Sequence, residues 1–184
     1  MAVQPKLVTV SEFEEFILRP ENEDQRFELL DGRILEKVPT EEHGVYTLNI
    51  GTEFRLYARQ HGGRAAVEAR HNNPDDPYND RIPDVSYTSA ARMLPLVKEG
   101  AVPQMPEVAV EVKSPDDTYA KMRRKAAFYI ENGARMVWLV FPEKRQIEVY
   151  YENGDLKILD ENGILDGGDV MPGFTMSVRA VFEE

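Results

Sequence analysis

Hydrophobic and polar residues alternate along residues 107–115, and this alternation predicts a β-strand with two different faces. Val108, Val110 and Val112 share one face of the predicted strand, while Glu111 and Lys113 share the other. The pattern fits a solvated edge strand, and it also fits a strand that holds a catalytic centre against a core. The neighbouring segments are needed to choose between these readings.

The segments after this strand predict a strand–helix–strand unit. Asp116 or Asp117 can cap a helix over about residues 118–132. Residues 136–141 are continuously apolar, which is typical of a strand buried on both faces. Because two strands joined through one helix are commonly parallel neighbours, we expect these two strands to pair in parallel.

The remaining segments predict hairpins and helices around this unit. Ser11 begins a capping-box pattern for a short N-terminal helix, and Asp31-Gly32 predicts a tight turn in a hairpin over 26–39. Thr40 can cap a helix that extends to Gly62-Gly63. The other predicted elements are strands at 64–71 and 81–87, a short helix within 90–105, a hairpin over 146–159 and a strand near 174–181.

The order of these elements predicts an α/β (mixed α+β) fold, with a mixed β-sheet flanked by helices. With 184 residues, 42% hydrophobic and 30% charged, the chain is expected to form one globular domain over 1–184. No apolar run approaches the length of a membrane span, and the N-terminus lacks a signal-peptide pattern.

Composition narrows the chemistry further. The chain has no cysteine, which excludes disulfides, thiolate metal sites and a cysteine nucleophile, and we expect a cytoplasmic location. The net charge of −11 argues against non-specific binding of polyanions over the whole surface. It leaves room for a local basic groove, and it fits a site that gathers carboxylates around a divalent cation.

Three carboxylates are predicted on strands and away from the apolar stripes: Glu28, Asp84 and Glu111. Magnesium prefers oxygen ligands, and a nearby lysine such as Lys113 can orient a water or neutralise charge that develops on a phosphoryl group. Taken from its own segment, Glu28 reads as a solvated strand residue. His43 reads as a surface or cap residue near a helix start.

The pair Pro83-Asp84 followed by Glu111-Val112-Lys113 resembles the motif of the PD-(D/E)XK nuclease superfamily. More specifically, the chain resembles the Uma-type putative restriction endonuclease family over about residues 9 to 182. The segments that carry this likeness are 26–32, 39–43, 82–85, 110–115, Lys125 with Tyr129 and Gly133, 138–140 and 171–174.

The resemblance implies a restriction-endonuclease-like core and a Mg²⁺-dependent endonuclease that hydrolyses phosphodiester bonds of DNA, with Mn²⁺ as a possible substitute. It implies Asp84 and Glu111 as metal ligands, with the Val112 carbonyl as a possible third, and Glu28 as an additional acid. Many family members carry the catalytic lysine on the following helix, where this chain has Lys125. Both lysines are therefore candidates, and we prefer Lys113. A homodimer is a possible assembly.

Two other functions stay open. A nuclease-fold module with weak or no activity would fit the acidic composition. A glycosidase-like carboxylate pair would need two acids at a suitable separation, and the lysine of the motif and the lack of an aromatic-rich sugar platform count against it.

Overall fold

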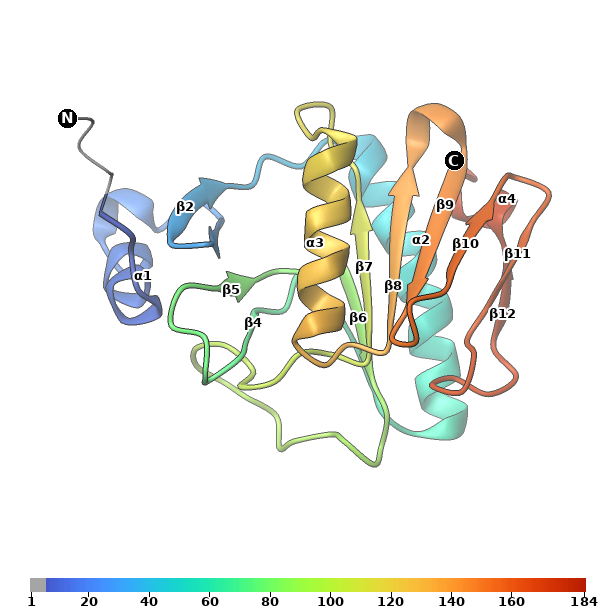
Figure 1. The fold of residues 1–184 in the computed structure, drawn as a ribbon, viewed down its shortest axis with the longest axis horizontal. Coiled ribbons are helices and arrows are strands. Elements are labelled where there is room, and N and C mark those ends of the chain that lie inside the picture. Colours follow the sequence, from blue (N-terminus) through green and yellow to red (C-terminus); the bar gives the residue numbers. More distant parts are fainter. Residues whose placement is uncertain (1–5) are drawn as a thin grey trace.

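A six-stranded mixed sheet forms the centre of the structure (Figure 1), a computed structural model that describes residues 6–184. Its strand order is β10-β9-β8-β7-β6-β3. The strands are β3 (Arg64–Val67), β6 (Val85–Thr88), β7 (Val108–Val112), β8 (Met136–Phe141), β9 (Gln146–Tyr151) and β10 (Leu156–Leu159). The predicted strand–helix–strand unit is confirmed, because β7 and β8 pair in parallel while the other neighbours are antiparallel.

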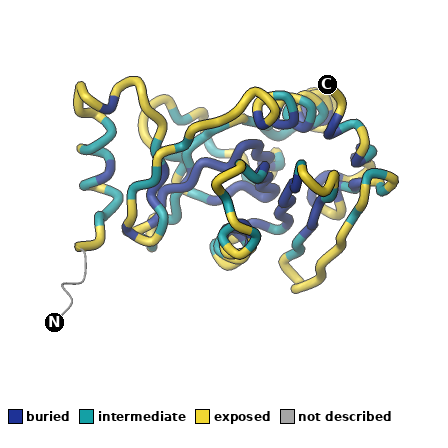
Figure 2. The backbone as a smooth tube through the Cα atoms, turned by 90° about the horizontal axis from the view of Figure 1, so that it is seen from above, coloured by how far each residue is buried: buried dark blue, intermediate teal, exposed yellow. Residues whose placement is uncertain are grey.

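Two long helices cover the two faces of this sheet. The valines of β7 pack in one core cluster with α2 (Glu41–His61), whereas Ala109 packs in a second cluster with α3 (Tyr119–Glu131). Figure 2 shows the result as a layer of buried strands between helices whose outer sides are exposed. The alternation along β7 therefore separates two cores, and the face that carries Glu111 is covered by α3.

A smaller sheet lies beside the main sheet, next to α1 in Figure 1, with the strand order β2-β1-β5-β4. Its strands are β1 (Phe27–Leu30), β2 (Arg33–Glu36), β4 (His71–Asn72) and β5 (Asp80–Arg81). The remaining elements are α1 (Val10–Ile17), the short 3-10 helices η1 (Pro20–Asn22) and η2 (Pro142–Lys144), β11 (Ile164–Asp166), β12 (Thr175–Ser177) and α4 (Val178–Val181). The hairpin turn at Asp31-Gly32 has positive φ at both residues, as its sequence predicted.

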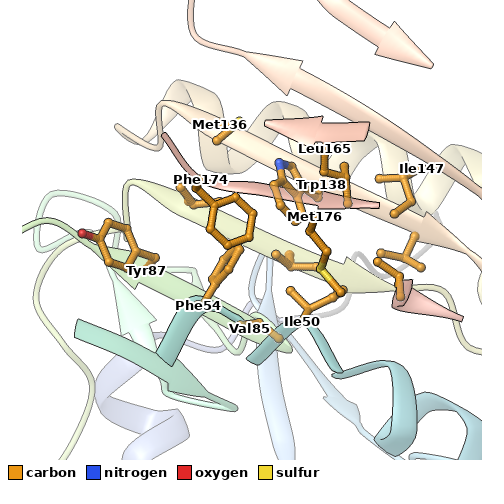
Figure 3. Close-up of a cluster of buried hydrophobic side chains, with 14 of the residues drawn as sticks. Ile50, Phe54, Val85, Tyr87, Met136, Trp138, Ile147, Leu165, Phe174 and Met176 are labelled. Atoms are coloured by element: carbon orange, nitrogen blue, oxygen red, sulfur yellow. The ribbon is translucent and has the colours of Figure 1, made fainter. Parts of the chain in front are cut away.

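Aromatic packing joins α2 to the middle of the sheet and to the C-terminal segment (Figure 3). The ring of Phe54 lies 5.2 Å from that of Trp138 and 5.4 Å from that of Phe174, both edge to face. All three side chains are buried. This cluster fixes β8 and, through the parallel ladder, β7.

Several local predictions are corrected by the structure. The N-cap of α1 is Thr9, not Ser11, because Thr9 and Glu12 exchange the reciprocal capping hydrogen bonds. The N-cap of α3 is Thr118, whose hydroxyl accepts from the Lys121 N–H. Asp117, one of the two predicted caps, instead accepts from the Ser114 N–H.

Other differences concern where elements begin and end. Residues 90–105 form turns and irregular loop, not a short helix. The strand predicted at 81–87 is divided into β5 and β6 around Pro83, which has no N–H for a sheet ladder. The strand predicted near 174–181 is shorter, and its second half is α4. No helix within residues 6–184 combines the length and the apolarity that crossing a bilayer requires.

Candidate active site

Asp84 and Glu111 come together because β6 and β7 are neighbouring strands. Asp84 directly precedes β6, and its N–H donates to the Val110 carbonyl at 2.9 Å. Its carboxylate atom Oδ2 accepts from the Val112 N–H at 2.7 Å. This register places Asp84 beside the strand position of Glu111, and both carboxylates are buried.

Helix α3 supplies the partners of Glu111. Lys125 and Tyr129 are four residues apart and therefore lie on one face of the helix, toward the sheet. Lys125 Nζ lies 2.9 Å from Glu111 Oε2, and the Tyr129 hydroxyl donates to Glu111 Oε1 at 2.7 Å. Lys125 Nζ also lies 3.2 Å from Oε1 of Glu28, which reaches the site from β1 in the smaller sheet.

Asp84 has its own two basic neighbours. Lys37, which follows β2, places Nζ 2.8 Å from Asp84 Oδ1 and 2.9 Å from the Ile82 carbonyl oxygen. His43, in the first turn of α2, places Nε2 3.1 Å from Asp84 Oδ2. The expected surface position of His43 is wrong, because only 5% of the residue is exposed.

We call Glu28, Lys37, Asp84, Glu111 and Lys125 the carboxylate cluster. Its three acids and two lysines are all held within the protein, with Lys37 the most accessible member at 18% side-chain exposure. Because opposite charges alternate through the cluster, each carboxylate lies beside at least one ammonium group.

Burial and charge compete in setting the pKa values of the cluster. Burial alone would raise the pKa of Asp84, but the charge of Lys37 and the hydrogen bond from His43 outweigh it, so the pKa lies well below its usual range. At Glu111, burial prevails over the attraction of Lys125, and the pKa is raised. Burial would lower the pKa of Lys125, but Glu111 and Glu28 outweigh it and raise that pKa.

The cluster opens into a cavity of about 120 Å³. Glu28, Lys37, His43 and Lys125 line the cavity, together with rim residues that include Asp116, Asp117 and Lys121. Glu28 Oε2 is buried and has no hydrogen-bond partner within residues 6–184. The reading of Glu28 as a solvated strand residue is therefore wrong, and its orphaned oxygen is a free ligand position next to the cavity.

Lys113 points elsewhere although it follows β7 directly. Its ammonium lies 3.3 Å from the Glu143 carboxylate and 3.3 Å from the Ser114 carbonyl oxygen, with the Tyr119 ring nearby. Within the described residues it forms no ion pair with Glu28, Asp84 or Glu111. Of the two candidate lysines, the structure brings Lys125 into the carboxylate cluster and leaves Lys113 outside it.

The sequence profile of a family named Uma2, "Putative restriction endonuclease", matches residues 11–179. The chain belongs to the Uma2 family. A solved structure, described as a putative nuclease belonging to DUF820 from Anabaena variabilis ATCC 29413, is 20% identical and superimposes with a TM-score of 0.79. The match covers 95% of this chain and 97% of that one, and it shows that the two share a fold. No curated protein sequence matches the chain.

Sequence reasoning missed three residues of this Uma2 site: Lys37, His43 and Tyr129. Tyr129 was named with Lys125 among the residues that carry the family resemblance but was given no role at the site, although its spacing of four from Lys125 indicates that both face the same partner. Lys37 and His43 carried no comparable signal. They reach Asp84 because the segment that joins β2 to α2 passes over the end of β6.

The donor atoms suit a hard cation. Among residues 6–184, no three or more His, Cys, Asp or Glu side chains form a group that could hold a metal ion by themselves. Magnesium, however, usually takes only one or two protein carboxylates and completes its shell with water and substrate oxygens. The all-oxygen pair of Asp84 and Glu111 meets that lower requirement, and the partnerless Glu28 Oε2 belongs to a carboxylate that contacts the same Lys125 as Glu111.

Proposed function

We propose that the chain is a metal-dependent endonuclease that hydrolyses phosphodiester bonds of DNA at the carboxylate cluster. The observation that carries the proposal is the convergence of Asp84, Glu111 and Lys125 in one buried cluster, whose members Glu28, Lys37 and Lys125 line a cavity. Membership of a family described as "Putative restriction endonuclease" supports the reaction class.

Asp84 and Glu111 would hold Mg²⁺ or Mn²⁺, with the Val112 carbonyl as a further ligand. When bound, the cation supplies polarisation of the scissile phosphate and a lower pKa for the attacking water. The chain's own groups do the positioning. The Val112 N–H, Lys37 and His43 fix the Asp84 carboxylate, and the hydrogen bond from Tyr129 fixes that of Glu111.

We assign to Lys125, and not to the Lys113 that the sequence motif favours, the role of the lysine that stabilises charge on the scissile phosphate. The raised pKa of Lys125 keeps its ammonium charged at any physiological pH, because burial is outweighed by Glu111 and Glu28. A fixed positive charge beside the cavity can stabilise negative charge that develops on a phosphoryl group. It cannot act as a general base in that state.

Cleavage of supercoiled plasmid DNA in Mg²⁺ or Mn²⁺ tests the proposal. We expect nicking or linearisation by the wild type, and a loss of about 100-fold or more in Asp84→Asn and Glu111→Gln, because removing a group that stabilises the transition state commonly costs this much. Glu107→Gln is the matched control, since Glu107 is a buried acid preceding the same strand but bonds to the Ser89 N–H instead. Activity that survives both site substitutions would refute the mechanism.

The second candidate function is a nuclease-fold binding module without strong activity. The observation in its favour is that both oxygens of Asp84 and of Glu111 already have partners within the chain. Calorimetric titration with Mn²⁺ separates the candidates: binding that Asp84→Asn abolishes supports the nuclease, and an absence of binding by the folded wild type supports the module.

A further inference from the structure

A second cavity, of about 300 Å³, shares Lys125 of the carboxylate cluster with the first. Lys121 and Lys125 line both cavities, so the two are neighbours along α3. The second one is also lined by Arg81 and Arg124, with Asp31 and Glu131 as its acidic residues. Lys125 is already paired with Glu111 and Glu28, and Lys121 lies 2.6 Å from Asp117, so within the described residues Arg81 and Arg124 are the basic side chains of this cavity without a hydrogen-bonded carboxylate.

Arg81 is the unusual residue of this cavity. Only 2% of it is exposed, and its Nε and Nη1 atoms are buried without a hydrogen-bond partner among residues 6–184. Its nearest carboxylate, Asp31, lies 3.9 Å from Nη2, which is longer than a hydrogen bond, and the Asp31 side chain is largely exposed. A buried guanidinium is normally paired, so these N–H groups lack the acceptor that burial calls for.

The surroundings of Arg81 hold it in one orientation. The guanidinium carbon lies 4.0 Å from the centre of the Phe128 ring, so the aromatic side chain covers the flat face of the group. Stacking on a ring does not engage the N–H groups in the plane of the guanidinium, so they can still donate to an acceptor. Two such N–H groups match two oxygens of one phosphate. Arg124 adds an exposed cation that forms no ion pair within the described residues.

We propose that Arg81 and Arg124 bind a phosphate group of the DNA backbone next to the one that is cut. This assignment rests on the proposed nuclease function, because the adjacent carboxylate cluster is what makes a neighbouring backbone phosphate the expected ligand. Arg81 lies three residues before Asp84, separated from it only by Ile82-Pro83. A phosphate held by Arg81 would therefore fix the strand close to the carboxylates and set which bond enters the first cavity.

The phosphate site is tested by measuring the affinity for a labelled DNA duplex by fluorescence anisotropy. Ca²⁺ replaces Mg²⁺ in this assay, so that binding is measured without cleavage. We expect Arg81→Gln to weaken DNA binding about tenfold and Arg124→Gln about threefold, and each to reduce the slope of log Kd against log salt by about one. Arg59→Gln is the matched control, because Arg59 is exposed on α2, on the opposite face of the sheet, and forms no ion pair among residues 6–184.

The outcomes separate this inference from the proposed function. DNA cleavage by the wild type together with unchanged Kd and salt slope in both variants would overturn the phosphate site and leave the nuclease standing. Weaker, less salt-dependent binding in the variants would support the site even if the wild type cuts nothing. Inorganic phosphate serves as a second probe: if phosphate protects the wild type against heat but the duplex does not bind, the DNA assignment is wrong. Arg124 is exposed, so its variant remains informative if Arg81→Gln does not fold.

Discussion

Replacing Lys125 by methionine removes an ammonium that contacts both Glu111 and Glu28. Methionine retains most of the aliphatic volume of lysine, so the change removes charge and leaves little cavity. Two buried carboxylates then face each other without the ammonium between them. Tyr129 still donates to Glu111, whereas Glu28 loses its ion-pair partner within the described residues.

The expected loss of stability is large because the ion pair is buried, and comparison with an exposed ion pair of the same chain shows this. Lys125 and Glu111 are 2.9 Å apart with side-chain exposures of 6% and 2%, while Lys157 and Asp166 are 3.0 Å apart with exposures of 53% and 44%. Breaking a buried pair by removing one partner costs about 3–5 kcal/mol, because the remaining charge stays in a poorly solvated site. An exposed pair at the same distance contributes about 0–1 kcal/mol. Lys157→Met is therefore the control.

The assay is urea unfolding followed by the fluorescence of Trp138, the single tryptophan of the chain, which is fully buried. Without Lys125 the pKa of Glu111, already raised by burial, rises further. A carboxyl group whose pKa is higher in the folded state destabilises the fold above that pKa and is relieved as the pH falls. The defect of Lys125→Met is thus expected to be larger at about pH 8 than at about pH 5.

Adding Glu111→Gln to Lys125→Met removes one of the stranded charges, so the double variant is expected to be more stable than the sum of the single effects predicts. A loss below about 1 kcal/mol in Lys125→Met, or a loss that does not depend on pH, would refute the claim that burial makes this pair strong.

Three further predictions concern stability. Phe174→Ala should lower the free energy of unfolding by about 3–5 kcal/mol in the same urea assay, because it empties a position packed against Phe54; a loss under about 1 kcal/mol would contradict that packing. Gly63→Ala should lower the melting temperature, since Gly63 has φ of +87° and an added Cβ would lie 2.6 Å from the Thr88 carbonyl oxygen. The lowered pKa of Asp84 stabilises the fold above the usual pKa of an aspartate, about 4, and this contribution is lost progressively as the pH falls below that value. Asp84→Asn should therefore show a flatter acid-unfolding curve, and an unchanged curve would count against the ion pairs of Asp84.

The sequence predicted the central elements because their patterns are strong. The alternation of residues 107–113 correctly separated the valines from Glu111, and the apolar run at 136–141 correctly indicated a buried parallel neighbour. The caps were less predictable, since Thr, Ser and Asp are chemically similar capping residues and tertiary contacts choose among them.

Whether a charged side chain is buried or exposed could not be predicted from the hydrophobic pattern. A lysine such as Lys125, within a basic stretch of helix, looks solvated until the partner on the facing strand is known. Lys113 did not follow the simple alternation rule: it lies just beyond β7, which ends at Val112, and its ammonium contacts Glu143 and the Ser114 carbonyl oxygen. Glu28 and His43 became part of the site through tertiary packing of segments distant in sequence, which periodicity does not report.

The two lysines of the carboxylate cluster give the chain internal counterions. A protein that buries three carboxylates together ordinarily needs a bound cation to offset their repulsion, much as small zinc domains need their metal to fold. Here Lys37 and Lys125 neutralise the acids from within, so the fold should hold equally well in a chelator such as EDTA. A divalent cation entering this site would have to compete with ammonium groups tethered at high effective concentration. In the proposed nuclease, occupancy of the metal site would then depend on the local concentrations of both the ion and a phosphate that helps to bind it, and metal and substrate would each strengthen binding of the other.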